Sequence, residues 1–145
     1  MIRGRRVAID VGTVRVGIAM SDTSGLVAAP LSTVDPDSLE DFLLNLKNEE
    51  EIAVIYVGLP LHLSGREGAS AAMARATASQ LSDSLGLPIR LLDERLTTVI
   101  ASDRTTKSGE KIDRSTIDQS AAVALLEFAL QAESNSGTFA GIDVK

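Results

Sequence analysis

The chain has 145 residues, of which 44% are hydrophobic and 23% are charged, and it carries a formal net charge of −6, one histidine and no cysteine. This length and composition predict one packed domain over residues 1–145 and exclude a disordered or fibrous chain. Disulfides, thiolate or multi-histidine zinc sites, iron–sulfur clusters and cysteine nucleophiles are excluded as well. Any bound metal must therefore have oxygen ligands, which favours Mg²⁺ or Mn²⁺.

Targeting segments are not apparent in the sequence. The N-terminal run MIRGRRVAID has only a short apolar stretch, broken by Asp10, and no segment reaches the roughly 18 apolar residues of a membrane span. We therefore expect a cytoplasmic protein.

Hydrophobic periodicity predicts nine elements in the order βββαβαβαα. β-Branched apolar runs indicate strands, and apolar residues that recur every three or four positions indicate helices. Turn and cap signals, such as Gly12–Thr13 between the first two strands and Gly86 after the second helix, separate them. In chain order we expect strands over 5–11, 14–21 and 26–34, a helix through Leu39–Leu46 that begins at Asp37 or Ser38, a strand over 52–57, a helix over 67–85, a strand over 88–92, a short helix over 97–104, a helix over 117–132 and a flexible tail over 134–145.

This order predicts an α/β fold with a mixed five-stranded sheet flanked by helices. The first two strands form a hairpin, and the later strands alternate with helices. In such sheets, functional sites collect at the strand ends, where the loops meet.

Three acidic positions lie at such places. Asp10 is inside the apolar strand VAIDVG, Asp93 and Glu94 close the strand IRLL, and Asp118 begins the last apolar helical stripe. Strand alternation allows only one of Asp93 and Glu94 to join Asp10, but periodicity does not choose between them. Three carboxylates on different elements are what a hard, oxygen-ligated cation needs, and two such ions could orient a water and stabilise the leaving oxygen of a phosphodiester.

Each acid also has a purely structural interpretation. Asp10 could accept backbone N–H bonds from the Gly12–Thr13 turn, and the acidic pair could form a surface ion pair with Arg95. Asp118 could complement the helix dipole. These alternatives stay open at the level of the sequence.

Basic residues could form a rim around the acids that contacts nucleic-acid phosphates. Seven acids and Lys47 lie between Asp35 and Glu51, so the rest of the chain is neutral on balance despite the net charge of −6. The loop from Gly58 to Gly68 also joins a strand to a helix N-terminus, where N–H groups can bind phosphate. The candidate phosphate contacts are Arg15, Arg66, Arg95, Lys107, Lys111 and Arg114, and Arg3, Arg5, Arg6 and Arg104 also flank the acidic segments.

Four blocks of the chain together resemble the YqgF family of pre-16S rRNA nucleases, also described as Holliday-junction-resolvase-like proteins. The resemblance implies an RNase H-like fold, a role in trimming the 5′ end of precursor 16S rRNA, and a catalytic and metal-binding site formed by Asp10, Glu94 and Asp118. It favours Glu94 over Asp93. The blocks are AIDVGTVRVGIAMSD at 8–22, VGLPLHLSGREG at 57–68, LLDERLTT at 91–98 and IDQSAAVALLEFAL at 117–130.

The chain departs from bacterial junction resolvases at one position of this site. Those more distant relatives carry a second acid near the aspartate of the last helix, whereas Ala121 stands one turn after Asp118 here. Asp113 or Asp93 could supply an extra ligand, or water could complete the coordination.

Other functions compete with the nuclease. The segment IDVGTVRVGIA also looks like the first phosphate loop of actin-like kinases and ATPases, but those proteins hold nucleotide between two such domains. A resolvase acting on branched DNA and a non-catalytic RNA-binding assembly factor are further alternatives. Scarce aromatic residues argue against base stacking on single strands, so we expect recognition of backbone and shape. Monomer and homodimer are both open.

Overall fold

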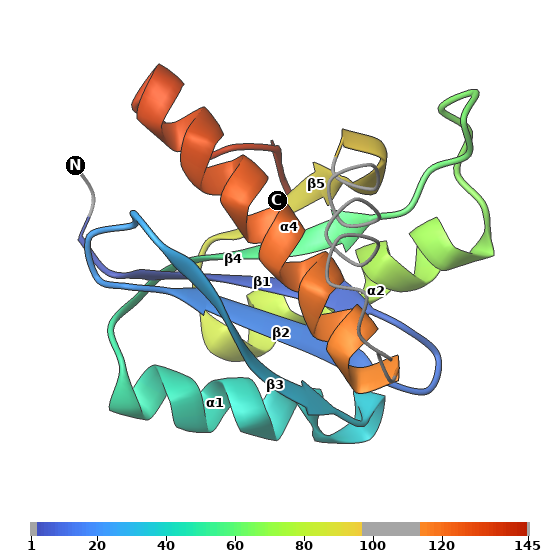
Figure 1. The fold of residues 1–145 in the computed structure, drawn as a ribbon. Coiled ribbons are helices and arrows are strands. Elements are labelled where there is room, and N and C mark those ends of the chain that lie inside the picture. The colour runs from blue at the N-terminus through green and yellow to red at the C-terminus, as the bar shows by residue number, and fades with distance from the viewer. Residues whose placement is uncertain (1–2, 97–113, 145) are drawn as a thin grey trace.

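The computed structural model describes residues 3–96 and 114–144, without the side chains of residues 114–118. Its centre is a six-stranded mixed sheet with the strand order β3-β2-β1-β4-β5-β6 (Figure 1). The elements are β1 (Arg5–Val11), β2 (Val16–Ser21), β3 (Ala28–Val34), the 3₁₀ turn η1 (Pro36–Ser38), α1 (Leu39–Glu49), β4 (Ile52–Leu59), α2 (Ala69–Leu85), β5 (Ile89–Asp93), η2 (Glu94–Leu96), α4 (Arg114–Ser136) and β6 (Ile142–Asp143).

The strand directions bring three strand ends together. β1, β2 and β3 form an antiparallel meander, whereas β1, β4 and β5 are mutually parallel, and β6 is antiparallel to β5. The C-terminal ends of β1, β4 and β5 therefore lie side by side at one end of the sheet.

Helices cover both faces of the sheet. One apolar core joins α1 and α2 to alternate residues of the strands, including Ile9 and Leu91. The opposite face carries Ala8, Tyr56 and Leu92 and packs under α4, which crosses β1, β2 and β3 (Figure 1). Alternating side chains explain why the central strands are apolar on both faces. Within the part of the chain that is described, no helix is both long and apolar enough to cross a membrane.

The predicted α/β fold is confirmed, and the described elements follow the predicted order from β1 to α4. β1 has the predicted bounds, the first two strands form the expected hairpin, and α2 ends at Gly86 in the left-handed conformation. β4 continues to Leu59, beyond its predicted end, so that Gly58 belongs to the strand. The short helix predicted over 97–104 lies outside the described residues.

The prediction of five strands followed by a flexible tail differs from the structure. α4 extends to Ser136, and residues 142 and 143 add the sixth strand, β6, to the edge of β5. Arg90 donates side-chain hydrogen bonds to the carbonyls of Ala140 and Gly141, at 3.0 and 2.7 Å. A Cβ at Gly141 would overlap the carbonyl oxygen of Leu91, so glycine is what allows this close approach. In the sequence, the glycine-containing tail suggests a flexible end, whereas in the structure Gly141 permits a contact with β5.

Candidate active site

Asp10 lies near the end of β1 on the face of the sheet that α4 covers. It follows the alternation of Ala8, which is buried under α4, whereas Ile9 is buried under α1 and α2. On β2 the residue paired with Asp10 is Gly17, and the parallel register of β4 brings Gly58 beside it. The half-buried carboxylate therefore has a glycine on each neighbouring strand.

In the turn after β1, the backbone N–H of Gly12 bonds to Arg15 and not to Asp10. The Gly12 N–H donates to the carbonyl of Arg15 at 2.9 Å and closes the hairpin turn. A Cβ at Gly12 would lie 2.6 Å from that oxygen, so the turn needs a glycine.

Glu94 reaches the same place from β5. It is the first residue after the strand and follows the alternation of Leu92, which faces α4. Its side chain passes directly over Gly58, where a Cβ would lie 2.5 Å from Glu94 Oε1 and 2.9 Å from a methyl carbon of Leu125. The missing side chain at Gly58 is therefore the space that Glu94 occupies on its way to Asp10.

The two carboxyl groups interact strongly. Burial, a hydrogen bond with Asp10 and the negative charges of Asp10 and Asp93 raise the pKa of Glu94 to about 9. At neutral pH, in the metal-free protein, Glu94 thus holds a proton that it donates to the Asp10 carboxylate. Two carboxyl groups held together at strand ends, one of them with a strongly raised pKa, are typical of functional sites.

Asp93 takes a different position. Its carboxylate accepts hydrogen bonds from the Arg95 guanidinium at 2.7 Å and from the Arg95 backbone N–H at 2.9 Å. Arg95 holds the pKa of Asp93 below its usual range. The structure thus pairs Glu94 with Asp10 and pairs Asp93 with Arg95, a choice that periodicity left open.

The third predicted acid lies in α4, but its side chain is outside the described part of the chain. Residue 118 is one helical turn before Ala122, which is fully buried against the sheet. The next residue, Gln119, donates a hydrogen bond to Thr33 at 2.9 Å, and Thr33 pairs with Gly17, the β2 partner of Asp10. The backbone of α4 at this point therefore passes over β3, two strands away from the β1 strand that carries Asp10, and the participation of Asp118 stays a prediction.

The predicted phosphate contacts divide into three groups. Arg15, half-buried, ends the hairpin turn beside Asp10, and Arg66 is exposed in the loop between β4 and α2. Arg95 binds Asp93 and accounts for the predicted surface ion pair. Arg104, Lys107, Lys111 and the candidate ligand Asp113 lie outside the described residues, and of Arg114 the backbone alone is described.

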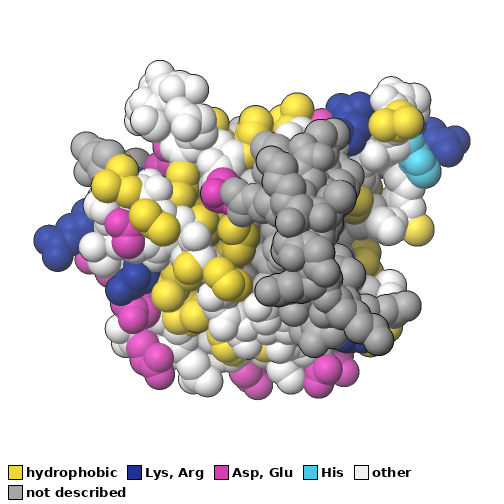
Figure 2. Space-filling view, in the orientation of Figure 1, with side chains coloured by type: hydrophobic (Ala, Val, Ile, Leu, Met, Phe, Trp, Pro, Cys, Tyr) yellow, Lys and Arg dark blue, Asp and Glu magenta, His cyan; other side chains and the backbone are white. Residues whose placement is uncertain are grey.

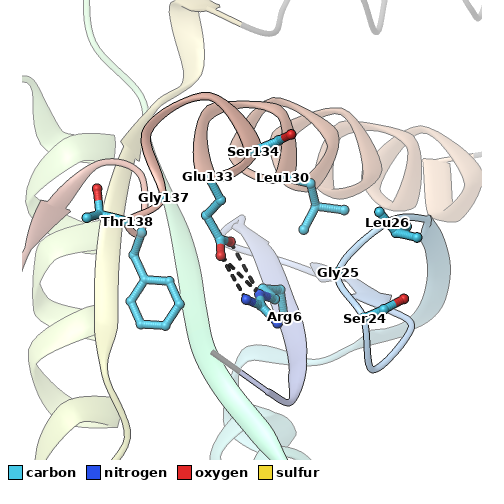
Figure 3. Close-up of a pocket in the computed structure, with 10 residues that line it drawn as sticks. Arg6, Ser24, Gly25, Leu26, Leu130, Glu133, Ser134, Gly137 and Thr138 are labelled. Atoms are coloured by element: carbon cyan, nitrogen blue, oxygen red, sulfur yellow. Dashed lines mark hydrogen bonds and ion pairs between the residues drawn. The ribbon is translucent and has the colours of Figure 1, made fainter. Parts of the chain in front are cut away.

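The N-terminal arginines do not belong to this rim, because they lie at the opposite end of β1. Arg3 and Arg5 pair with Glu51 and Glu50. Arg6 is 2% exposed and binds Glu133 of α4 at 2.9 Å beside a cavity of about 290 Å³ (Figure 3). These arginines are close to Asp10 in the sequence but not in space, because the extended strand β1 separates them from Asp10.

A divalent cation fits the chemistry of the acids. Within residues 3–96 and 119–144, no cluster of three acidic or histidine side chains stands ready to hold a metal. Asp10 and Glu94 supply two carboxylates, and the third predicted ligand falls on the undescribed side chain at position 118. The protonation of Glu94 is the expected response of paired carboxylates without a cation, and hard oxygen donors suit Mg²⁺ or Mn²⁺.

Sequence reasoning missed the glycine that makes room for Glu94. Gly58 interrupts an apolar strand, which is a signal of close approach by another group. The interpretation of Gly58 as part of a phosphate-binding loop overlooked this alternative.

The fold resembles that of the nuclease RuvC, which has an RNase H-like fold. A structure of Thermus thermophilus RuvC in complex with Holliday junction substrate superposes with a TM-score of 0.59 at 14% identity, covering 94% of this chain and 99% of that one. A second RuvC structure from the same organism gives 0.55 at 14% identity, over 93% and 98%. These likenesses concern the fold alone.

Sequence comparison identifies the family. The family model of RuvX, described as Holliday junction resolvase, matches residues 4–132. A relative from Streptomyces avermitilis is 43% identical over all of this chain and 97% of its own length, and one from Streptomyces coelicolor is 44% identical over 94% and 86%. Both carry the name "Putative pre-16S rRNA nuclease". The chain belongs to the RuvX family, which confirms the resemblance found in the sequence.

Proposed function

We propose that this chain is a divalent-metal-dependent nuclease that hydrolyses phosphodiester bonds of precursor 16S rRNA, with Asp10, Glu94 and Asp118 as its acidic site. The observation that carries the proposal is the contact between Asp10 and Glu94 across Gly58. The names of the relatives and the RuvC-like fold support a nuclease. The relatives' printed name favours rRNA, and the family description keeps branched DNA as the alternative substrate.

The site residues have distinct tasks in this proposal. Asp10 and Glu94, with Asp118 from α4, would hold Mg²⁺ or Mn²⁺. When bound, such ions activate a water and stabilise the developing charge on the phosphate. Asp10 is held by the sheet, and Gly58 keeps the path of Glu94 open, so both carboxylates are positioned before substrate arrives. Arg15 and Arg66 would contact the phosphates that flank the cleaved bond.

Binding without catalysis is a weaker explanation of this geometry. Adjacent carboxylates repel a phosphate backbone unless a cation neutralises them, so a module that only binds RNA gains nothing from the pair. An actin-like nucleotide site lies between two such domains, and residues 3–96 and 114–144 form one sheet with its flanking helices.

The test is cleavage by the purified full chain. A precursor 16S rRNA fragment and a four-way DNA junction are incubated with Mn²⁺, Mg²⁺ or EDTA. We expect cutting of the RNA that needs the metal and is lost in Asp10→Asn and Glu94→Gln. Asp41→Asn, an exposed acid of α1, is the matched control and should cut normally. Equal cutting by Asp10→Asn and wild type would refute the mechanism. Faster cutting of the junction than of the RNA would show that the substrate is branched DNA.

A further inference from the structure

The segment between β4 and α2 forms a small hairpin that projects from the molecule. We call residues Leu61–Glu67 the finger. Its two ends are joined by a β-bridge between Leu61 and Glu67, and the His62 N–H donates to the Arg66 carbonyl at 2.9 Å. Gly65, with φ +88°, donates to the His62 carbonyl at 2.8 Å and turns the chain. Figure 1 shows the finger rising beyond the end of β4, at the end of the sheet where Asp10 and Glu94 lie.

Leu63 stands at the tip of the finger and is 96% exposed. Figure 2 shows apolar atoms at this tip near the one histidine and basic side chains. A single exposed leucine is ordinary on a protein surface. This one differs because the hairpin bonds hold it at a defined place, away from the body of the protein.

The finger is braced against the acidic site. Arg95, which follows Glu94 directly, donates to the Leu63 carbonyl at 3.3 Å while it binds Asp93. At the other side of the hairpin, Glu67 binds Arg75 of α2 at 2.6 Å. Movement of the finger would therefore disturb both the segment that carries Glu94 and the contact with Arg75 in α2.

The charges of the finger suit a polyanion. The acids Glu67 and Asp93 are each paired with an arginine. Arg66 is exposed beside the tip and forms no ion pair with any other described residue. The finger thus presents an apolar tip flanked by a cation, which complements bases flanked by phosphates.

We propose that the finger is a wedge for base-paired nucleic acid, in which Leu63 enters between two stacked bases while Arg66 contacts the adjacent phosphate. Apolar side chains that unstack a base step are a known means of kinking a duplex. Arg95 acts as a positioning residue that fixes the tip relative to Asp10 and Glu94. The inference rests on the proposed nuclease function and refines it: the substrate is folded RNA opened next to the bond to be cut, rather than extended single strands.

The experiment measures base opening apart from cleavage. All variants carry Asp10→Asn and are mixed, with Mg²⁺ present, with stem–loop RNAs that hold 2-aminopurine at successive stem positions, or with single-stranded oligouridylate. We expect fluorescence to rise at one stem position with the wild-type finger and to stay flat with Leu63→Ala. Affinity for the stem–loop should fall about tenfold in Leu63→Ala, with oligouridylate affinity within about twofold, because only the stem contains a stacked step to be filled.

Two further variants serve as controls. Leu63→Met should restore the fluorescence signal, and Leu26→Ala, which removes a 74% exposed leucine between β2 and β3, should change nothing. A Leu63→Ala protein that opens the stem as well as Leu26→Ala would overturn the wedge, as would an equal loss of affinity for both RNAs. If opening depends on Leu63 but the wild-type protein cuts neither RNA nor DNA with either metal, the wedge stands and the nuclease function fails.

Discussion

The side chain of Glu94 occupies the space above Gly58 that any other residue's Cβ would fill, at 2.5 Å from Glu94 Oε1. This relationship joins three neighbouring strands, because Gly58 of β4 separates Asp10 of β1 from Glu94 after β5. The acidic pair therefore depends on a residue that has no functional group of its own.

Replacement of Gly58 by alanine tests this dependence. We expect Gly58→Ala to displace Glu94 and to reduce cleavage at least about tenfold, with overpacking against Leu125 costing about 1–3 kcal/mol of stability. The matched control is Gly86→Ala, which strains a left-handed residue with φ +65° and open space around it. It should cost about 1 kcal/mol and leave cleavage unchanged. Normal cleavage by Gly58→Ala would show that Glu94 has another route to Asp10.

The pKa of Glu94 predicts how the stability of the metal-free protein depends on pH. Its folded-state pKa of about 9 lies above the ordinary glutamate value of 4.5, so the folded protein holds this proton more tightly than the unfolded chain does. The stabilisation is complete below about pH 4.5 and is lost as pH rises through about 9. Urea denaturation in EDTA between these limits should show a falling free energy of unfolding, and Glu94→Gln should abolish this contribution. A Glu94→Gln protein with an unchanged slope would assign the effect to other groups.

Divalent cations should reverse this loss. At pH 8 we expect Mn²⁺ or Mg²⁺ to raise the melting temperature, because a bound cation removes the repulsion that ionisation of Glu94 creates. A hundredfold excess over the dissociation constant would stabilise the fold by about 2.7 kcal/mol. The shift should be smaller at pH 5, where protons compete for the carboxylates, and absent in Asp10→Asn at either pH. An equal shift in Asp10→Asn would place the cation elsewhere.

Asp118 is the third acid of the proposed site and can be tested directly. Asp118→Asn should reduce cleavage at least about a hundredfold, since a metal ligand contributes several kcal/mol to transition-state stabilisation. Asp113→Asn and Asp93→Asn, made in parallel, identify any extra ligand. Because Arg95 already binds Asp93, we expect Asp93→Asn to keep most of the activity. Full activity of Asp118→Asn would show that α4 contributes no metal ligand at this position.

The buried pair of Arg6 and Glu133 should matter for stability and not for catalysis. Glu133 also accepts a hydrogen bond from the Tyr56 hydroxyl at 3.0 Å. Glu133→Ala would leave the arginine charge buried, and we expect a loss of about 3–5 kcal/mol with normal cleavage at low temperature. Glu51→Ala breaks the exposed pair with Arg3 and should cost less than about 1 kcal/mol. Loss of cleavage in a folded Glu133→Ala protein would connect this end of β1 to the site.

Hydrophobic periodicity in the sequence was enough to predict most of the helices and strands. The hairpin of β1 and β2, the helical stripes of α1 and α2 and the position of Asp10 in an apolar strand all follow from periods of two and 3.6 residues, which depend on short-range backbone geometry. The family resemblance, carried by four spaced blocks, led to the same fold and favoured Glu94.

The tertiary structure alone decided which groups meet. Glu94 rather than Asp93 joins Asp10 because Glu94 follows the alternation of Leu92, which faces α4 as Ala8 does, and the parallel register of β1, β4 and β5 brings these strand ends together. Arg6 was removed from the candidate rim because it lies at the far end of the same strand, and residues 142 and 143 became a strand because Arg90 and the edge of β5 satisfy them. Local sequence determined the elements and the kinds of chemistry available, whereas contacts between distant residues depend on packing, which no local pattern encodes.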